Sequence, residues 1–104
     1  MEDFVKQSLL FDFYGDLLTE HQKSVYGDYI QENLSLSEIA ADSGISRQGA
    51  YDMVRRCKVL LEGYEEKLHL VEKFVEIKEM VREIGKAESL DEAKNKSEEI
   101  LDLL

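Results

Sequence analysis

The sequence predicts an all-α protein that contains a helix-turn-helix, and three observations support this prediction. The chain of 104 residues has no proline, no tryptophan and only six glycines. Charged residues make up 35% of it, and Glu, Lys and Leu, which favour helices, dominate over β-branched residues. Apolar residues recur at helical spacing in nearly every segment. A β-sandwich or β-barrel is therefore not expected.

A chain of this length forms one domain with a core of its own. We expect a single all-α domain over residues 1–104, with a helix-turn-helix core at 19–61 and a C-terminal helical region for dimerisation or packing at 62–104. No apolar run approaches the roughly 20 residues of a membrane span, so we expect no membrane insertion. The single cysteine excludes an internal disulfide and favours a cytoplasmic location.

The first helices are predicted from their apolar faces and their capping residues. A helix from about Asp3 to Leu17 would bury one aromatic stripe, made of Phe4, Leu10, Phe11, Tyr14, Leu17 and Leu18. Thr19 and Gln22 form a capping box that starts a second helix. The expected buried face of that helix is Val25, Tyr26, Tyr29 and Ile30, and Asn33 suits its C-terminal end.

A short helix, a turn and a long helix should follow. Ser35 and Glu38 form a second capping box, and the short helix reaches about Ser43 before Gly44 breaks it. Ser46 can cap a long helix. We expect that helix to end at Gly85, with a break at Gly63 as the alternative, because glycine costs about 1 kcal/mol relative to alanine inside a helix.

The long helix carries apolar residues in a 4-3-4-3-4 spacing that starts at Cys57, which is typical of a coiled-coil seam. A last helix, opened by the capping pair Ser89 and Glu92, would bury Leu90, Ala93, Ile100, Leu101 and Leu104. The long helix and the last helix together offer more apolar surface than the first two helices easily cover. We therefore expect a homodimer, with the alternative of a monomer that covers the seam internally. The predicted dimer seam is Leu61, Tyr64, Leu68, Val71 and Val75.

The segment from Leu36 to Arg55 has the residue pattern of a helix-turn-helix. Ala40 is small where two helices cross closely, Gly44 can adopt the left-handed backbone of the turn, and Ile45 can fill the space between the helices. The start of the second helix would then face outward. The candidate nucleic-acid-binding residues on it are Ser46, Arg47, Gln48, Tyr51, Arg55, Arg56 and Lys58.

The charge distribution supports that candidate surface. The formal net charge of the chain is −10, yet residues 46–58 contain four basic side chains and one acidic side chain. Arginine and glutamine pair with guanine and adenine edges, and a helix start suits a phosphate. Asp52 on the presented face and Gly49 in the first turn weigh against binding. A helix-turn-helix used only for packing is the alternative.

The chain also resembles known proteins. From Leu17 through Leu61 it resembles region 4 of bacterial sigma factors, notably in the run Leu34-Ser-Leu-Ser-Glu-Ile-Ala-Ala-Asp-Ser-Gly-Ile-Ser-Arg-Gln-Gly-Ala-Tyr-Asp. Nearly the whole chain is similar to the small YlxM-like helix-turn-helix proteins of Gram-positive bacteria. The run Phe11-Asp-Phe-Tyr-Gly-Asp-Leu-Leu-Thr, with Gln22, Tyr29, Ser46-Arg-Gln and Tyr51-Asp, carries this likeness.

The resemblance implies an all-α, dimeric protein that is encoded beside the signal recognition particle (SRP) GTPase and regulates that targeting pathway. We therefore expect a non-enzymatic, nucleic-acid-binding regulator with DNA or RNA, and SRP components, as partners. The alternative is a protein-binding adaptor that keeps the helix-turn-helix as a scaffold. No cofactor or metal site is expected, because Cys57 falls on the apolar seam and His21 and His69 have no ligand spacing.

Overall fold

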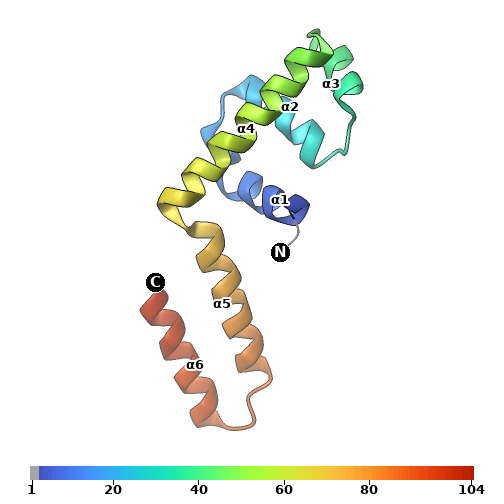
Figure 1. Ribbon diagram of the computed structural model, residues 1–104. Helices are drawn as coiled ribbons and strands as arrows, with labels where there is room; N and C mark the ends of the chain where they lie inside the picture. Colours follow the sequence, from blue (N-terminus) through green and yellow to red (C-terminus); the bar gives the residue numbers. More distant parts are fainter. Residues whose placement is uncertain (1–2) are drawn as a thin grey trace. The chain divides into compact units, whose positions relative to one another are not determined.

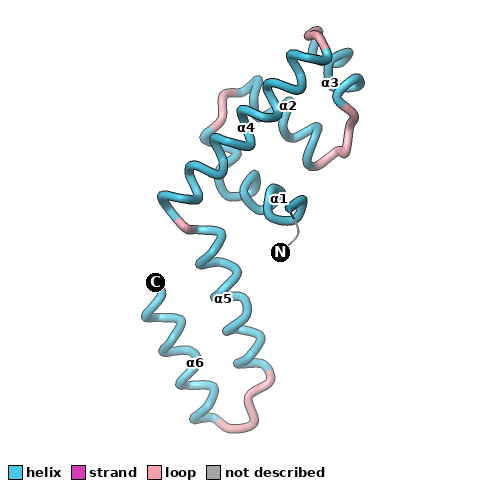
Figure 2. Tube along the Cα trace, in the orientation of Figure 1, coloured by secondary structure: helices cyan, strands magenta, loops and turns pink. Residues whose placement is uncertain are grey.

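The computed structural model describes residues 3–104 as helices joined by short turns, and no strand occurs among them. Figures 1 and 2 trace the helices along the chain. Their bounds are α1 Asp3–Tyr14, the 3₁₀ turn η1 Gly15–Leu17, α2 Glu20–Ile30, α3 Leu36–Ser43, α4 Arg47–Leu68, α5 Leu70–Gly85 and α6 Leu90–Leu103. The predicted all-α fold is confirmed.

The chain forms two compact units, which are residues 1–68 and 69–104. In the first unit α4 packs against α1, α2 and α3, and in the second unit α5 packs against α6 (Figure 1). The predicted helix-turn-helix core at residues 19–61 lies within the first unit, and the predicted C-terminal region at 62–104 includes the whole second unit. α4 continues for seven residues past the predicted end of the core because it still contacts α1 there, through Tyr14 and Glu65.

Local capping explains where most helices begin. Thr19 accepts a hydrogen bond from the Gln22 amide at 3.2 Å and its own amide donates to the Gln22 side chain at 3.0 Å, which is a complete capping box. Ser35 and Glu38 form the second complete box. Both predicted boxes are confirmed, because such caps satisfy amides that the helix itself leaves unpaired.

The third predicted box is only half formed. Ser89 accepts a hydrogen bond from the Glu92 amide at 3.1 Å. The Glu92 side chain accepts its hydrogen bond from the Glu88 amide at 3.2 Å instead of from the Ser89 amide. The start of α6 is therefore as predicted, but one of the two expected capping contacts shifts by one residue.

The expected single helix from Ser46 to Gly85 is wrong, because it is divided into α4 and α5 at His69. This residue has φ 55° and ψ 28°, which is the left-handed region. Gly63, the alternative break point, stays inside α4, and Gly85 ends α5 as predicted. The 4-3-4-3-4 spacing therefore does not form one continuous seam.

Burial corrects several predicted core positions. Leu10, Phe11, Tyr14, Leu18, Val25, Tyr26 and Ile30 are buried as expected. Phe4 and Leu17 are more than half exposed, and Tyr29 is also exposed. The first helix ends as an α-helix at Tyr14, and the tighter 3₁₀ turn that follows rotates Leu17 away from the core. In α6 the expected Leu90, Leu101 and Leu104 are exposed.

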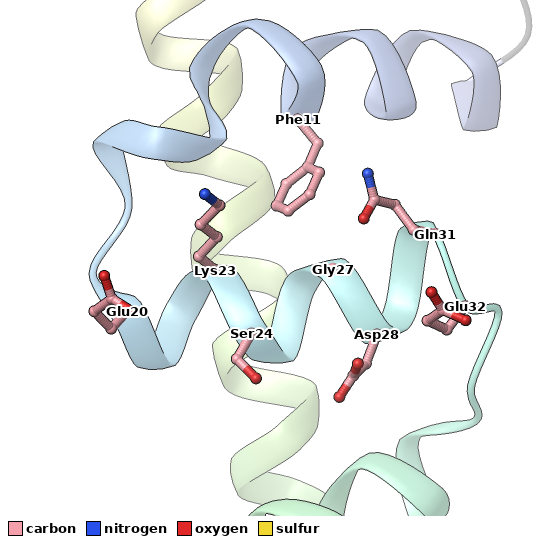
Figure 3. A pocket seen from close by; sticks show the side chains of 8 residues that line it. All are labelled: Phe11, Glu20, Lys23, Ser24, Gly27, Asp28, Gln31 and Glu32. Carbon is pink, nitrogen blue, oxygen red and sulfur yellow. The ribbon is translucent and has the colours of Figure 1, made fainter.

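Phe11 joins α1 to α2 (Figure 3), and two glycines make this contact possible. A Cβ atom at Gly15 would lie 3.2 Å from the Phe11 ring, and one at Gly27 would lie 3.3 Å from it. The ring also packs on Tyr26, with centroids 5.8 Å apart. The polar pocket of 410 Å³ beside this ring, shown in Figure 3, is lined on α2 mainly by side chains of mixed charge.

We expect Gly44→Val to lower the free energy of unfolding by about 1–3 kcal/mol through backbone strain. Gly44 has φ 66° and no atom lies within 4 Å of a Cβ built on it, so a side chain there would be strained without any clash. Gly44→Asn is the matched control, because asparagine tolerates this conformation and Asn33 adopts it here at φ 54°. Urea unfolding measures both variants. Equal stability of Gly44→Val and the parent protein would contradict the prediction.

Candidate nucleic-acid interface

The helix-turn-helix is held together by a small apolar cluster that α2, α3 and α4 share. Its fully packed members are Val25, Ile39, Ala40 and Ala50, and the partly buried residues against it are Leu34, Leu36, Ile45, Met53 and Val54. Ala40 and Ile45 therefore occupy the packing positions predicted for them, and Gly44 closes α3 in the left-handed conformation. The amide of Ile45 donates to the carbonyl of Ala40 at 3.1 Å and tightens the turn.

Ser46 begins the second helix of the motif as its N-cap. Its hydroxyl oxygen accepts a hydrogen bond from the Gly49 amide at 2.9 Å. A Cβ atom at Gly49 would lie 3.1 Å from that same oxygen, so the glycine keeps the cap uncrowded. Since the Gly49 amide is already bonded, the amides that a phosphate could reach are those of the two residues before it.

The candidate side chains at the start of α4 lie on the surface as predicted. Those exposed to solvent are Ser46, Arg47, Gln48, Tyr51, Arg55 and Arg56, and we call them the basic face. Lys58 is half-buried, and its Nζ lies 3.3 Å from the Asp3 carboxylate. Asp52, which was expected to repel phosphate, accepts a hydrogen bond from the Gln48 amide group at 3.0 Å. This contact holds the Gln48 side chain along the helix.

A groove of 440 Å³ opens beside the basic face, where α2, α3 and α4 meet. Its lining residues are Tyr29, Leu36, Tyr51, Val54, Arg55, Lys58, Val59 and Glu62. Tyr51, Arg55 and Lys58 were predicted as binding residues. Tyr29, Leu36 and Glu62 were not among the predicted binding residues, and Tyr29 was predicted to lie in the core.

A buried chain of hydrogen-bonded polar side chains, which was not predicted from the sequence, fixes α1 against α2 and α4. Gln7 is 2% exposed. Its side-chain NH₂ donates to Glu62 at 2.8 Å, and its side-chain oxygen accepts from the Tyr26 hydroxyl at 3.0 Å. Burial raises the pKa of Tyr26. The only signal in the sequence is a polar residue that shares a helical stripe with Leu10 and Tyr14.

Cys57 has the buried, apolar role that its spacing predicts. It is 0% exposed, and its thiol lies 3.9 Å from the carbonyl oxygen of Gln22. His21 and His69 are exposed, and the His69 ring lies 3.1 Å from Glu72. Across residues 3–104, no group of three His, Cys, Asp or Glu side chains is arranged to hold a metal ion.

Burial raises the pKa of the Cys57 thiol to about 11, above the value of about 8.5 for an exposed thiol. The folded protein therefore holds this proton more tightly than the unfolded chain. The resulting stability is fully present below about pH 8.5 and is lost as the pH rises through about 11. We expect the free energy of unfolding, measured by urea titration, to fall less steeply over this window in Cys57→Ala than in the parent. Equal slopes would contradict the assignment.

Comparison with known proteins agrees with this architecture. A protein family described as "Putative helix-turn-helix protein, YlxM / p13 like" matches residues 1–101. The UPF0122 protein YlxM of Bacillus subtilis strain 168 is 42% identical over 104 residues, covering 100% of this chain and 92% of the relative. A UPF0122 protein of Shouchella clausii is 39% identical, covering 98% of this chain and 94% of the relative.

A further relative is a UPF0122 protein of Clostridium kluyveri, which is 42% identical and covers 91% of this chain and 95% of the relative. In the part of the chain that the structure describes, no helix is both long enough and apolar enough to cross a membrane. The match spans both compact units. This chain therefore belongs to the UPF0122 family of YlxM- and p13-like helix-turn-helix proteins.

Proposed function

We propose that this protein is a non-enzymatic regulator that binds DNA or RNA through the basic face at the start of α4. The observation that carries the proposal is the coincidence of pattern, charge and exposure. The four basic side chains of residues 46–58 belong to a chain of net charge −10. Arg47, Arg55 and Arg56 extend into solvent from the second helix of a helix-turn-helix. That helix enters the major groove in proteins of this kind.

Two kinds of contact follow from the geometry. Arg47 and Gln48 lie in the first turn, where recognition helices contact base edges. Arg55 and Arg56 lie two turns further along and are suited to phosphates, which set affinity more than sequence preference. Because the rest of the chain is acidic, binding should be confined to this face and should fall with salt.

The test is fluorescence anisotropy with a labelled duplex at several salt concentrations. The expected result is an affinity that falls steeply with salt, with a slope of about −0.9 on logarithmic axes for each phosphate contacted. A variant that lacks three exposed lysines outside the basic face, Lys73, Lys78 and Lys86, provides the control. Absence of binding at low salt, or binding that salt does not weaken, would overturn the proposal.

The family resemblance supports a place for this regulator in the SRP targeting pathway, in the cytoplasm. The alternative is an adaptor for an SRP protein, which the exposed apolar side chains of α6 favour. Binding to the purified SRP GTPase, measured by calorimetry with and without nuclease treatment, separates the two. The adaptor would be supported by a complex that survives nuclease treatment and that the arginine variants form with the same affinity as the parent protein.

We also propose that a second copy of the chain covers the α5–α6 hairpin. Residues 69–104 bury only Val71 fully, and Val75, Val81, Leu90 and Leu101 are exposed. Units of fewer than about 40 residues usually need oligomerisation or another staple. The predicted seam needs correction: Leu61 is buried within the chain and Tyr64 packs on Tyr14 at 6.0 Å. Leu68 and Val75 remain exposed.

Sedimentation equilibrium at micromolar concentration should therefore give the mass of a dimer. Leu101→Glu places a charge on a side chain that is 69% exposed, so the monomer should tolerate it and the dimer should not. We expect this variant to sediment as a folded monomer with unchanged helical circular dichroism. Leu17→Glu, at an exposed site on η1, is the matched control and should remain dimeric. A parent protein that is monomeric throughout would refute the dimer.

A further inference from the structure

The groove where α2, α3 and α4 meet has a lining that differs from both the apolar core and the acidic surface. Two tyrosines line it, Tyr29 from α2 and Tyr51 from α4, and they are 39% and 47% exposed. Exposed aromatic rings are the usual platform for unpaired bases, because every base has a flat face that can stack. A base inside a duplex does not offer such a face, since it is already stacked on both sides.

The groove also carries positive charges that suit the phosphate of a nucleotide. Arg55 and Lys58 line the same groove and can neutralise a phosphate beside the stacked base. Lys58 is paired with Asp3, but their side chains are 42% and 72% exposed. Surface ion pairs of this kind are worth about 0–1 kcal/mol. A phosphate can therefore displace the Asp3 carboxylate easily.

Glu62 also lines the groove and supplies a hydrogen-bond acceptor. One of its carboxylate oxygens accepts from Gln7 at 2.8 Å, which holds the side chain in place. A carboxylate has about four acceptor sites in all, so capacity remains for an N–H donor on the edge of a base, such as the ring N–H of thymine. Leu36, Val54 and Val59 provide the apolar remainder of the lining.

Resting on the proposed function, we propose that this groove binds one unpaired nucleobase from a single-stranded segment that adjoins the duplex on the basic face. Tyr51 and Arg55 belong to both surfaces, so the two are continuous. An amphipathic helix of a protein partner is favoured less, because a helix needs a row of apolar contacts. Here the aliphatic lining is interrupted by Arg55 and Lys58.

The experiment compares a blunt labelled duplex with the same duplex carrying a single-stranded oligothymidine extension, both by anisotropy with the full chain. The extension should raise the affinity of the parent protein about tenfold, the effect expected of one stacked base. Tyr29→Ala should remove this gain and leave binding to the blunt duplex unchanged, because Tyr29 lies on α2 and outside the basic face. Tyr29→Phe keeps the ring and should keep the gain.

Phe4→Ala is the matched control, since Phe4 is an exposed aromatic side chain on α1 that does not line the groove. It should leave both affinities unchanged. Equal affinity of the parent for both probes would overturn the inference while the proposed function stands. Failure to bind either probe would overturn the proposed function itself. A gain that Tyr29→Ala retains would place the single strand elsewhere and would also overturn the inference.

Discussion

Replacing Ile39 with alanine should lower the free energy of unfolding by about 2–5 kcal/mol. Ile39 is 0% exposed and lies in the cluster that α3 shares with Val25 of α2 and Ala50 of α4. The cluster is small, so few side chains can move to fill the cavity that alanine would leave. Loss of the Ile39 side chain should also weaken the packing of α3 on α4, the two helices that form the helix-turn-helix.

Urea unfolding followed by circular dichroism measures this loss. Ile39→Val, which removes one methyl group, should cost only about 0.5–1.5 kcal/mol. Leu17→Ala is the exposed control, because Leu17 is 57% exposed; it should change stability by no more than about 0.5 kcal/mol. A large effect of Leu17→Ala would indicate that Leu17 is buried in the core, as the helical pattern of the sequence predicted. A negligible effect of Ile39→Ala would contradict the cluster.

Removing all three arginines of the basic face, in the variant Arg47→Ala, Arg55→Ala and Arg56→Ala, should weaken binding to a duplex at least about tenfold. It should also reduce the salt slope by about one for each lost phosphate contact. The three side chains are exposed and are not members of the apolar cluster. The variant should therefore fold normally, and circular dichroism checks this.

The matched control removes the same charge from α5 and its C-cap, by Lys73→Ala, Lys78→Ala and Lys86→Ala. These three lysines are also exposed, so a purely global charge effect would weaken both variants alike. A single Arg47→Ala variant should lower specific affinity by about 1–3 kcal/mol if it contacts a base. Arg55→Ala should weaken all sequences equally. Unchanged binding by the triple arginine variant would contradict the assignment of the basic face.

The elements with strong local signals were predictable from sequence. Thr19 with Gln22, Ser35 with Glu38, and the left-handed Gly44 are each set by residues within one helical turn. The helix-turn-helix followed from them together with the small Ala40. Such signals are reliable because the hydrogen bonds that satisfy a helix end are local. The exposed position of Arg47, Gln48 and Tyr51 followed from the same register.

Other features were not predictable, because nothing local marks them. Residues around His69 include neither glycine nor proline, yet the chain becomes left-handed there and ends α4. A non-glycine residue in this conformation is unfavourable by about 1–2 kcal/mol. Packing contacts spread over many residues can outweigh this conformational cost. Helical periodicity in the sequence does not reveal where that happens. The same applies to Leu17, which a helical wheel placed in the core.

The amino-acid sequence by itself determined the helical class of this protein, its turn at Gly44 and the cationic side chains at the start of α4. Only the tertiary structure decided that Gln7 would link Tyr26 to Glu62, and that Tyr29 would line a groove with Tyr51. The physical reason is the separation along the sequence of the residues that interact. Caps and helical faces depend on neighbours within one or two turns, but a groove or a buried polar chain depends on residues 19 or more positions apart in the sequence.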